Sequence, residues 1–364
     1  MSVPAISGER SRAGMREPAE LRKRVQDELA AFFDRSEAAF TSPPALLQVF
    51  QLLRSFVLCG GKRLRPLFCY WGWLGAGGED CDEIVRVGAA LELFQAFALI
   101  HDDIMDGSEL RRGSPAMHRA LTGLHDSHTW RGDRDQFGVN VAILCGDLCL
   151  CYSDELMLGC GMPPARLLAT QPLINRMRSE VMIGQNLELL DQAGGGSLAG
   201  ALRIIRLKAA KYTIERPLQI GAMLAGGGPE LLEAYSRFAI PLGEAFQLRD
   251  DVLGVFGDAE ETGKPTMDDL REGKPTALIE LARERAGVEQ VRQVDQLHGN
   301  DDLDDEGAAT LRLIIVSTGA LETVETMIQQ RYATALVELD RIPVDAHVRA
   351  ALLELAAAAT VRAS

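Results

Sequence analysis

A long apolar run that ends in a group of aspartates constrains the fold of this chain more than any other feature. Over residues 82–106, apolar side chains such as Leu91 and Phe94 recur at the three- and four-residue spacing of a buried helix face. The run ends in Asp102, Asp103 and Asp106. Because residues four apart share a helix face, the first and last of these repel each other by about 0.2–0.5 kcal/mol. A hard cation such as Mg²⁺ would relieve the repulsion; a solvated acidic helix end is the alternative.

Basic residues lie close to this acidic helix end in the sequence. Arg111 and Arg112 follow it, and the segment GGKRLRP at residues 60–66 supplies Lys62 and Arg65 between two glycines and a proline. Cations beside a helix start form an anion site, although a solvated basic turn has the same composition. Carboxylates for a metal together with guanidinium groups indicate a polyanionic ligand such as a diphosphate.

A second acidic pair repeats this arrangement about 150 residues later. The segment GEAFQLRDDVLG at residues 243–254 places Gln247 and Asp250 or Asp251 on one helix face. Loops rich in glycine and proline then supply Lys264 and Lys274. Lys208 stands in an otherwise apolar helical run at residues 202–224, where a surface lysine is the alternative interpretation.

Helical periodicity dominates the chain, and no segment alternates with period two over a useful length. We therefore predict an all-α fold, a single large helical bundle with a central cavity built from facing helices. Residues 1–17 are polar, small and charged and should form a disordered tail, which leaves residues 18–364 as one domain. Residues 123–137 are also polar and predict a loop, with His118, His125 and His128 as surface residues rather than metal ligands.

Composition narrows the class of protein. The formal net charge of −14 argues against a nucleic-acid partner. Seven cysteines, an odd number without a C-x-x-C pair, predict buried thiols in a reducing compartment. No signal-peptide core and no uncharged apolar run of about 18 residues are evident, so we expect no integral membrane segment and a cytoplasmic location.

Five segments in this order give the chain a family resemblance that spans roughly residues 20–355. They are GGKRLRP, LELFQAFALIHDDIMDGSELRRG, ILCGDL, the region around Lys208, and FQLRDDVLGVFGDAEETGKPTMDDLREGKPT. The chain resembles the trans-isoprenyl diphosphate synthases of the polyprenyl synthetase family. The resemblance implies the all-α isoprenoid synthase fold, Mg²⁺ dependence, a homodimer, and condensation of isopentenyl diphosphate with an allylic diphosphate.

The resemblance also implies roles for individual residues. The diphosphate of isopentenyl diphosphate would be held by Lys62, Arg65, Gln95 and Arg112. The allylic diphosphate would be contacted by Arg111, Lys208 and Lys264, with Gln247 and Lys274 nearby. Metal ligands would be Asp102, Asp106 and Asp250, supported by Asp103 and Asp251. Departures from the usual pattern are Gly254 at the last position of the second motif, Ala209 in place of threonine, and Glu188 in place of aspartate.

Product length is predicted from the residues just before the first acidic motif. Here Phe97 stands beside the small Ala98, and the motif DDIMD has no insertion. This resembles members that form geranylgeranyl diphosphate, with farnesyl diphosphate as the second expectation, although Phe97 could serve only core packing. A class I terpene cyclase and a non-catalytic regulatory subunit are further alternatives. The first would lack GGKRLRP, and the second usually lacks an aspartate motif.

Overall fold

The computed structural model describes residues 18–40, 43–257 and 267–360. The predicted tail at residues 1–17 and Lys264 lie outside these ranges. Within them the elements are α1 (Pro18–Ser36), η1 (Glu37–Phe40), α2 (Pro44–Leu58), α3 (Leu64–Gly75), α4 (Asp82–Met105), β1 (Leu110–Arg111), β2 (Ser114–Pro115), α5 (Met117–Ser127), α6 (Arg134–Leu158), α7 (Pro164–Gly194), α8 (Leu198–Ile204), η2 (Ile205–Glu215), α9 (Arg216–Ala225), α10 (Pro229–Phe256), α12 (Asp268–Arg271), α13 (Ala277–Arg285), α14 (Val288–Leu297), α15 (Asp305–Ser317), α16 (Ala320–Asp340) and α17 (Ala346–Thr360).

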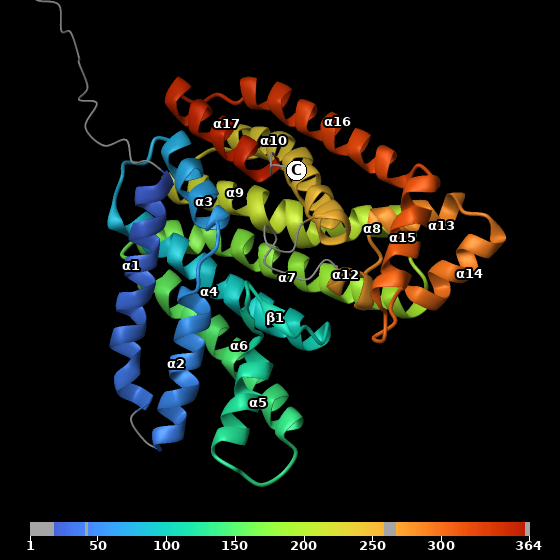
Figure 1. Cartoon of the computed structure of the whole chain (residues 1–364). Helices are drawn as coiled ribbons and strands as arrows, with labels where there is room; N and C mark the ends of the chain where they lie inside the picture. The colour runs from blue at the N-terminus through green and yellow to red at the C-terminus, as the bar shows by residue number, and fades with distance from the viewer. Residues whose placement is uncertain (1–17, 41–42, 258–266, 361–364) are drawn as a thin grey trace, which may run out of the picture.

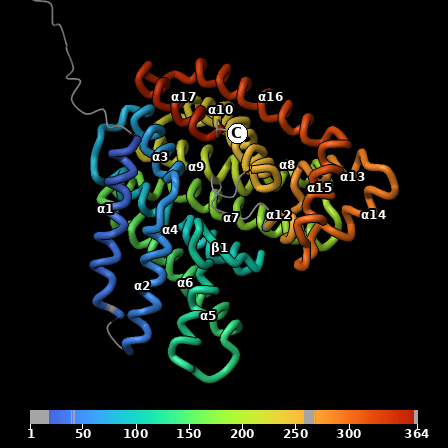
Figure 2. The backbone as a smooth tube through the Cα atoms, viewed as in Figure 1, coloured from blue at the N-terminus to red at the C-terminus, as the bar shows by residue number. Residues whose placement is uncertain are grey.

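The prediction of an all-α bundle is confirmed. Helix α4 packs against α6 and α3, α3 against α9, and α10 against η2 and α16. Figures 1 and 2 show α1 and α2 on one side of the molecule and α13–α15 on the opposite side, with α4, α7, α9 and α10 between them. The only strands among the described residues are β1 and β2, which pair antiparallel in the turn that follows α4.

Helix α4 is apolar on nearly all sides because other helices surround it. Val87, Ala90, Leu93 and Phe94 are at most 1% exposed. By length and composition alone α4 could cross a membrane, and the bent pair α15–α16 would pass the same test as one broken span. However, 67% of the most apolar window of α4 is buried within the protein, which is typical of a core helix. Arg86 and Glu92 lie within α4, so it is not an uncharged apolar run of about 18 residues, and it does not contradict the expectation drawn from the sequence.

Between α8 and α9 the helix widens into a π-helical segment, η2, over residues 205–215. π-Helical turns are rare and are frequently found at functional sites. Pro217 follows in the first turn of α9, where a proline is tolerated because its missing N–H would have no partner. The sequence signalled a break here but not the π-helical winding.

The polar segment after β2 differs from the prediction. Helix α5 continues to Ser127, and His118 and His125 are each only 4% exposed. His125 packs against Trp130 and Phe137, so aromatic contacts replace solvent around it. The expectation of surface histidines is therefore wrong for these two residues.

Candidate active site

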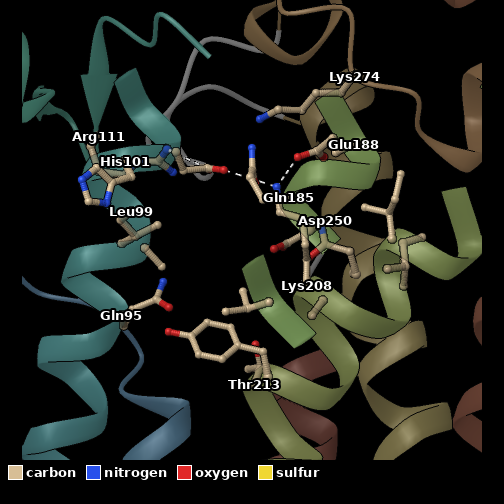
Figure 3. A pocket seen from close by; sticks show the side chains of 18 of the residues that line it. Gln95, Leu99, His101, Arg111, Gln185, Glu188, Lys208, Thr213, Asp250 and Lys274 are labelled. Atoms are coloured by element: carbon tan, nitrogen blue, oxygen red, sulfur yellow. Dashed lines mark hydrogen bonds and ion pairs between the residues drawn. The ribbon is translucent and has the colours of Figure 1, made fainter. Parts of the chain in front are cut away.

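A cavity of about 1430 Å³ lies between the C-terminal half of α4 on one side and α7, η2 and α10 on the other. Figure 3 shows Gln95, Leu99 and His101 on the wall formed by α4, and Lys208, Thr213 and Asp250 on the opposite wall. The predicted site residues that line it are Lys62, Arg65, Gln95, Phe97, Ala98, Asp102, Arg111, Arg112, Lys208, Gln247, Asp250, Asp251 and Lys274. The fold thus gathers residues that are far apart in the sequence around one space.

Asp102 lies at the centre of the charged end of this cavity. Its carboxylate is 3.3 Å from Nζ of Lys208 and 3.8 Å from a guanidinium nitrogen of Arg111. Burial pushes the pKa of Asp102 upward, but Lys208, Lys274 and Arg111 outweigh it and lower the pKa. Lys208 also forms an ion pair with Glu188. Asp102 is therefore held as a carboxylate, and Lys208 as a cation between two carboxylates.

Asp103 does not line the cavity. Its side chain is fully buried, and Arg111 donates to it through Nε at 2.7 Å and through a second nitrogen. This pairing fixes Arg111 at the cavity wall beside Asp102. We therefore expect Asp103 to act on the site through Arg111.

Asp106 ends α4 and faces the loop before α13. Nζ of Lys274 lies 3.0 Å from Asp106 and 2.7 Å from Glu272, and Ser108 donates to Glu272 at 3.0 Å. Burial raises the pKa of Asp106 to about 6, with Asp102 and Glu272 adding to the rise against the effect of Lys274. Glu272 gave no signal in the sequence.

The second acidic pair lies on α10 across the cavity. Asp251 is 8% exposed and accepts a hydrogen bond from Gln247 at 2.9 Å. Burial raises the pKa of Asp251 to about 8, and the carboxylates of Asp269, Asp250 and Glu188 raise it further against the effect of Gln247. The carboxylates on this wall therefore repel one another.

These residues fit a divalent cation by their chemistry. Carboxylates from α4 and α10 face one cavity, and burial, with neighbouring carboxylates adding to it, raises the pKa of Asp106 to about 6 and that of Asp251 to about 8. A hard cation prefers such oxygen ligands. Among the described residues, no three of these side chains converge closely enough to hold a metal alone. Asp102 and Asp250 line the cavity, and Asp106 lies outside its lining beside Lys274; these three would hold a divalent cation together with oxygens of a ligand.

The basic turn before α3 forms the other charged wall. Arg112 donates to the backbone oxygens of Cys59 at 2.7 Å and Gly60 at 2.9 Å. A Cβ at residue 61 would lie 3.1 Å from the Arg112 guanidinium, and the φ of Gly61 is +112°, so only glycine fits there without strain. Lys62 is exposed at the cavity mouth. Arg112, from the turn between β1 and β2, and Lys62, from the turn before α3, thus present cations to the cavity.

Arg65 reaches the cavity from the first turn of α3. Its guanidinium lies 4.1 Å from the ring centroid of Tyr212 and donates to Thr213 Oγ1 at 2.8 Å. Gln95 projects from α4 toward the same region, and its Oε1 is buried without a hydrogen-bond partner in the described structure (Figure 3). The π-helical segment η2 therefore contributes to two parts of the site. It carries Lys208, which lies beside Asp102, and it carries Tyr212 and Thr213, which contact Arg65.

The opposite end of the cavity is apolar. Phe97 lies 5.2 Å from Phe94 and 4.8 Å from His101 between ring centroids, and Ala98 lines the wall beside it. Ile143 of α6 and Val181 of α7 complete this end. A molecule with an anionic head and a hydrocarbon tail would therefore match the whole cavity.

Comparisons with known proteins agree with this geometry. Residues 48–313 match the model of the polyprenyl synthetase family. The chain is 32% identical over 292 residues to a geranylfarnesyl diphosphate synthase of Aeropyrum pernix, covering 79% of this chain and 85% of the relative. It is 29% identical over 307 residues to a geranylgeranyl diphosphate synthase of Sulfolobus acidocaldarius, covering 83% and 87%. The crystal structure of a Corynebacterium glutamicum geranylgeranyl pyrophosphate synthase with isoprenyl diphosphate and magnesium superposes with a TM-score of 0.92 at 39% identity, covering 96% of this chain and all of that one.

Proposed function

The chain belongs to the polyprenyl synthetase family and is a trans-prenyltransferase, and we propose that its main product is geranylgeranyl diphosphate. The reaction condenses isopentenyl diphosphate with an allylic diphosphate. The single observation that supports the product most directly is the apolar end of the cavity, where one aromatic residue, Phe97, lies beside the small Ala98. Relatives named for geranylgeranyl diphosphate support this product, whereas the Aeropyrum pernix relative is named for a longer one.

Charge governs the chemistry proposed for the allylic diphosphate. Lys208 and Arg111 lie beside Asp102, and they would stabilise the negative charge that develops on the leaving diphosphate as its carbon–oxygen bond breaks. Mg²⁺ bound to the aspartates would act as a Lewis acid on the same oxygens. The family uses a divalent metal ion. That this ion is Mg²⁺ in the present protein is part of our proposal.

The second substrate would bind where the turn before α3 meets α4. Lys62, Arg65, Gln95 and Arg112 offer donors for the diphosphate of isopentenyl diphosphate. Its double bond would then attack the allylic cation in a space lined by apolar side chains, which keeps water away from the cation. The cation formed by this attack would lose a proton to give the new double bond of the product. Tyr212 and Phe97 contribute aromatic faces to that space.

We also propose a homodimer through the outer face of α6 and α7. Exposed apolar side chains are concentrated there: Leu144 is 65% exposed, Ile183 51% and Leu190 65%. The cavity residues Ile143 and Met182, which are 39% and 40% exposed, border the same face. Large exposed apolar patches typically mark protein–protein contacts. Light scattering would test the dimer, and a monomer at all concentrations would contradict it.

We propose a cytoplasmic location on the chemistry of the cysteines. All seven are free thiols, and burial raises the pKa of Cys145 to about 12. Free thiols are typical of a reducing compartment. Fractionation of cells that produce the protein would test this.

Incubation of the purified protein with isopentenyl diphosphate, each of three allylic primers and Mg²⁺ tests the function. We expect geranylgeraniol as the main alcohol after dephosphorylation and no product when the metal is chelated. Farnesol as the main product would contradict the proposed length. Hydrocarbon released from the allylic substrate alone would instead indicate a terpene cyclase, and activity only with an added partner would indicate a regulatory subunit.

A further inference from the structure

Behind Phe97, the apolar end of the cavity has a second aromatic layer. Phe94 is 1% exposed and contacts two residues that line the cavity, Phe97 at 5.2 Å and Tyr212 at 5.7 Å between ring centroids. A hydrocarbon chain that passes Phe97 would therefore meet the ring of Phe94 next.

An arginine supports this ring. The guanidinium carbon of Arg178, on α7, lies 5.5 Å from the ring centroid of Phe94. The side chain is only 15% exposed, and Asp154 of α6 pairs with it. A guanidinium over an aromatic face contributes about 0.5–2 kcal/mol, depending on how far it is desolvated. Arg178 is thus tethered from one helix while its charge holds a ring on another.

The position of this contact along the cavity is fixed by two helices that run in the same direction. Phe94 lies eight residues before Asp102 on α4, about 12 Å along the axis, and Arg178 lies ten residues before Glu188 on α7, about 15 Å. Lys208 joins Asp102 and Glu188 at the charged end. The pair Phe94–Arg178 therefore lies about 12–15 Å along these helices from the charged end formed by Asp102, Glu188 and Lys208.

We propose that Arg178 is a positioning residue for product length: tethered by Asp154, it holds the ring of Phe94 as a second stop behind Phe97. Hydrocarbon that displaced the ring would have to lie against a guanidinium group without water, which is unfavourable. This inference rests on the proposed function, because it assumes a growing prenyl chain in the cavity. In this proposal the ion pair between Arg178 of α7 and Asp154 of α6 sets the upper limit of product length.

Product profiles of paired variants test this role. In a Phe97→Ala background, Arg178→Ala should lengthen the main product by at least one isoprene unit relative to Phe97→Ala alone, because the ring of Phe94 is released. Asp154→Asn should shift it in the same direction, and Arg178→Lys should keep the length of the background because the cation remains. Arg176→Ala, at an exposed arginine on the same helix, is the matched control and should change nothing.

Thermal unfolding of each variant shows whether the variant is folded, so that a change in product length is not confused with loss of the fold. If Arg178→Ala does not fold, Arg178→Met keeps most of the volume without the charge and should lengthen the product equally. Identical profiles for the Phe97→Ala protein with and without the change at Arg178 would overturn the inference. A wild-type protein that forms no prenyl product would instead overturn the proposed function on which the inference rests.

Discussion

Nζ of Lys274 lies 3.0 Å from the carboxylate of Asp106, which joins the end of the first acidic helix to the loop that follows the second. The same ammonium is 2.7 Å from Glu272 and 3.9 Å from Asp269. These carboxylates raise the pKa of Lys274 despite its burial, so it remains a cation. One positive charge therefore joins the end of α4 to α12 and the loop before α13.

Asp102→Ala and Asp250→Ala should each lower kcat by about 10²–10³-fold, the scale on which single electrostatic groups act in active sites. Asp102 faces Lys208 and Arg111, and Asp250 lines the opposite wall. Steady-state assays with Mg²⁺ would measure the loss, and circular dichroism would verify the fold. Near-normal turnover in both folded variants would contradict a metal site shared by the two helices.

The cations should divide between the two substrates. Lys62→Ala and Arg65→Ala should raise KM for isopentenyl diphosphate, whereas Lys208→Ala and Lys264→Ala should raise KM for the allylic substrate. Lys208 lies beside Asp102, while Lys62 and Arg65 lie at the end formed by the turn before α3. Lys264 lies outside the described residues, and its assignment comes from its place in the sequence motif alone. Four variants that all affect only the allylic substrate would refute the division.

The free energy of unfolding of the metal-free protein should fall as pH rises. Burial raises the pKa of Asp251 to about 8, whereas an unfolded aspartate titrates near pH 3.9, so between these values the folded state holds a proton that the unfolded state has lost. The contribution of this group is complete below about pH 4 and lost above about pH 8, with a slope of at most about 1.4 kcal/mol per pH unit.

Urea unfolding at several pH values without divalent cation measures this slope. Asp251→Asn should flatten it, since an amide cannot titrate. Added Mg²⁺ should raise the midpoint more at high pH, because metal ligands must be deprotonated. An unchanged slope in the Asp251→Asn variant would assign the effect to other groups.

The sequence was sufficient to predict the fold class and most of the charged residues around the cavity, because helical periodicity and charged helix ends are local features. It could not show which way a charged side chain turns. Arg63 belongs to the same basic run as Lys62, yet its backbone has a φ of +49° and its side chain pairs with Glu92 at 2.6 Å in the core. The basic run alone does not show that the side chain of Arg63 points into the core.

Contacts made by tertiary packing were also beyond local patterns. Glu272 reaches Ser108 and Lys274 only because the loop before α13 folds over the end of α4. The winding of η2 was equally unpredictable, since its sequence fits an ordinary helix. Both features position residues that the motifs had already identified.

Close packing between α3 and α9 depends on glycine. A Cβ at Gly72 would lie 2.1 Å from the carbonyl oxygen of Leu218, and one at Gly221 would lie 1.9 Å from that of Cys69. Gly72→Ala should therefore destabilise the protein by roughly 1–3 kcal/mol, the usual cost of overpacking. Gly123→Ala on α5, where no atom lies within 4 Å, is the matched control and should stabilise it by roughly 0.5–1 kcal/mol. Equal melting temperatures for the two variants would contradict the close approach.

Product length should respond in opposite directions to the two residues before the first acidic motif. Ala98 lies one turn before Asp102, about 6 Å along α4, and Phe97 lies about 7.5 Å along it. Both line the cavity, and the ring of Phe97 rests against Phe94 and His101. Phe97→Ala should lengthen the product, because the chain can then advance to the ring of Phe94, while Ala98→Phe should shorten it toward farnesyl diphosphate. Chromatography of the dephosphorylated alcohols measures both shifts. An unchanged profile in both variants would mean that Phe97 serves core packing and that the limit to elongation lies elsewhere in the cavity.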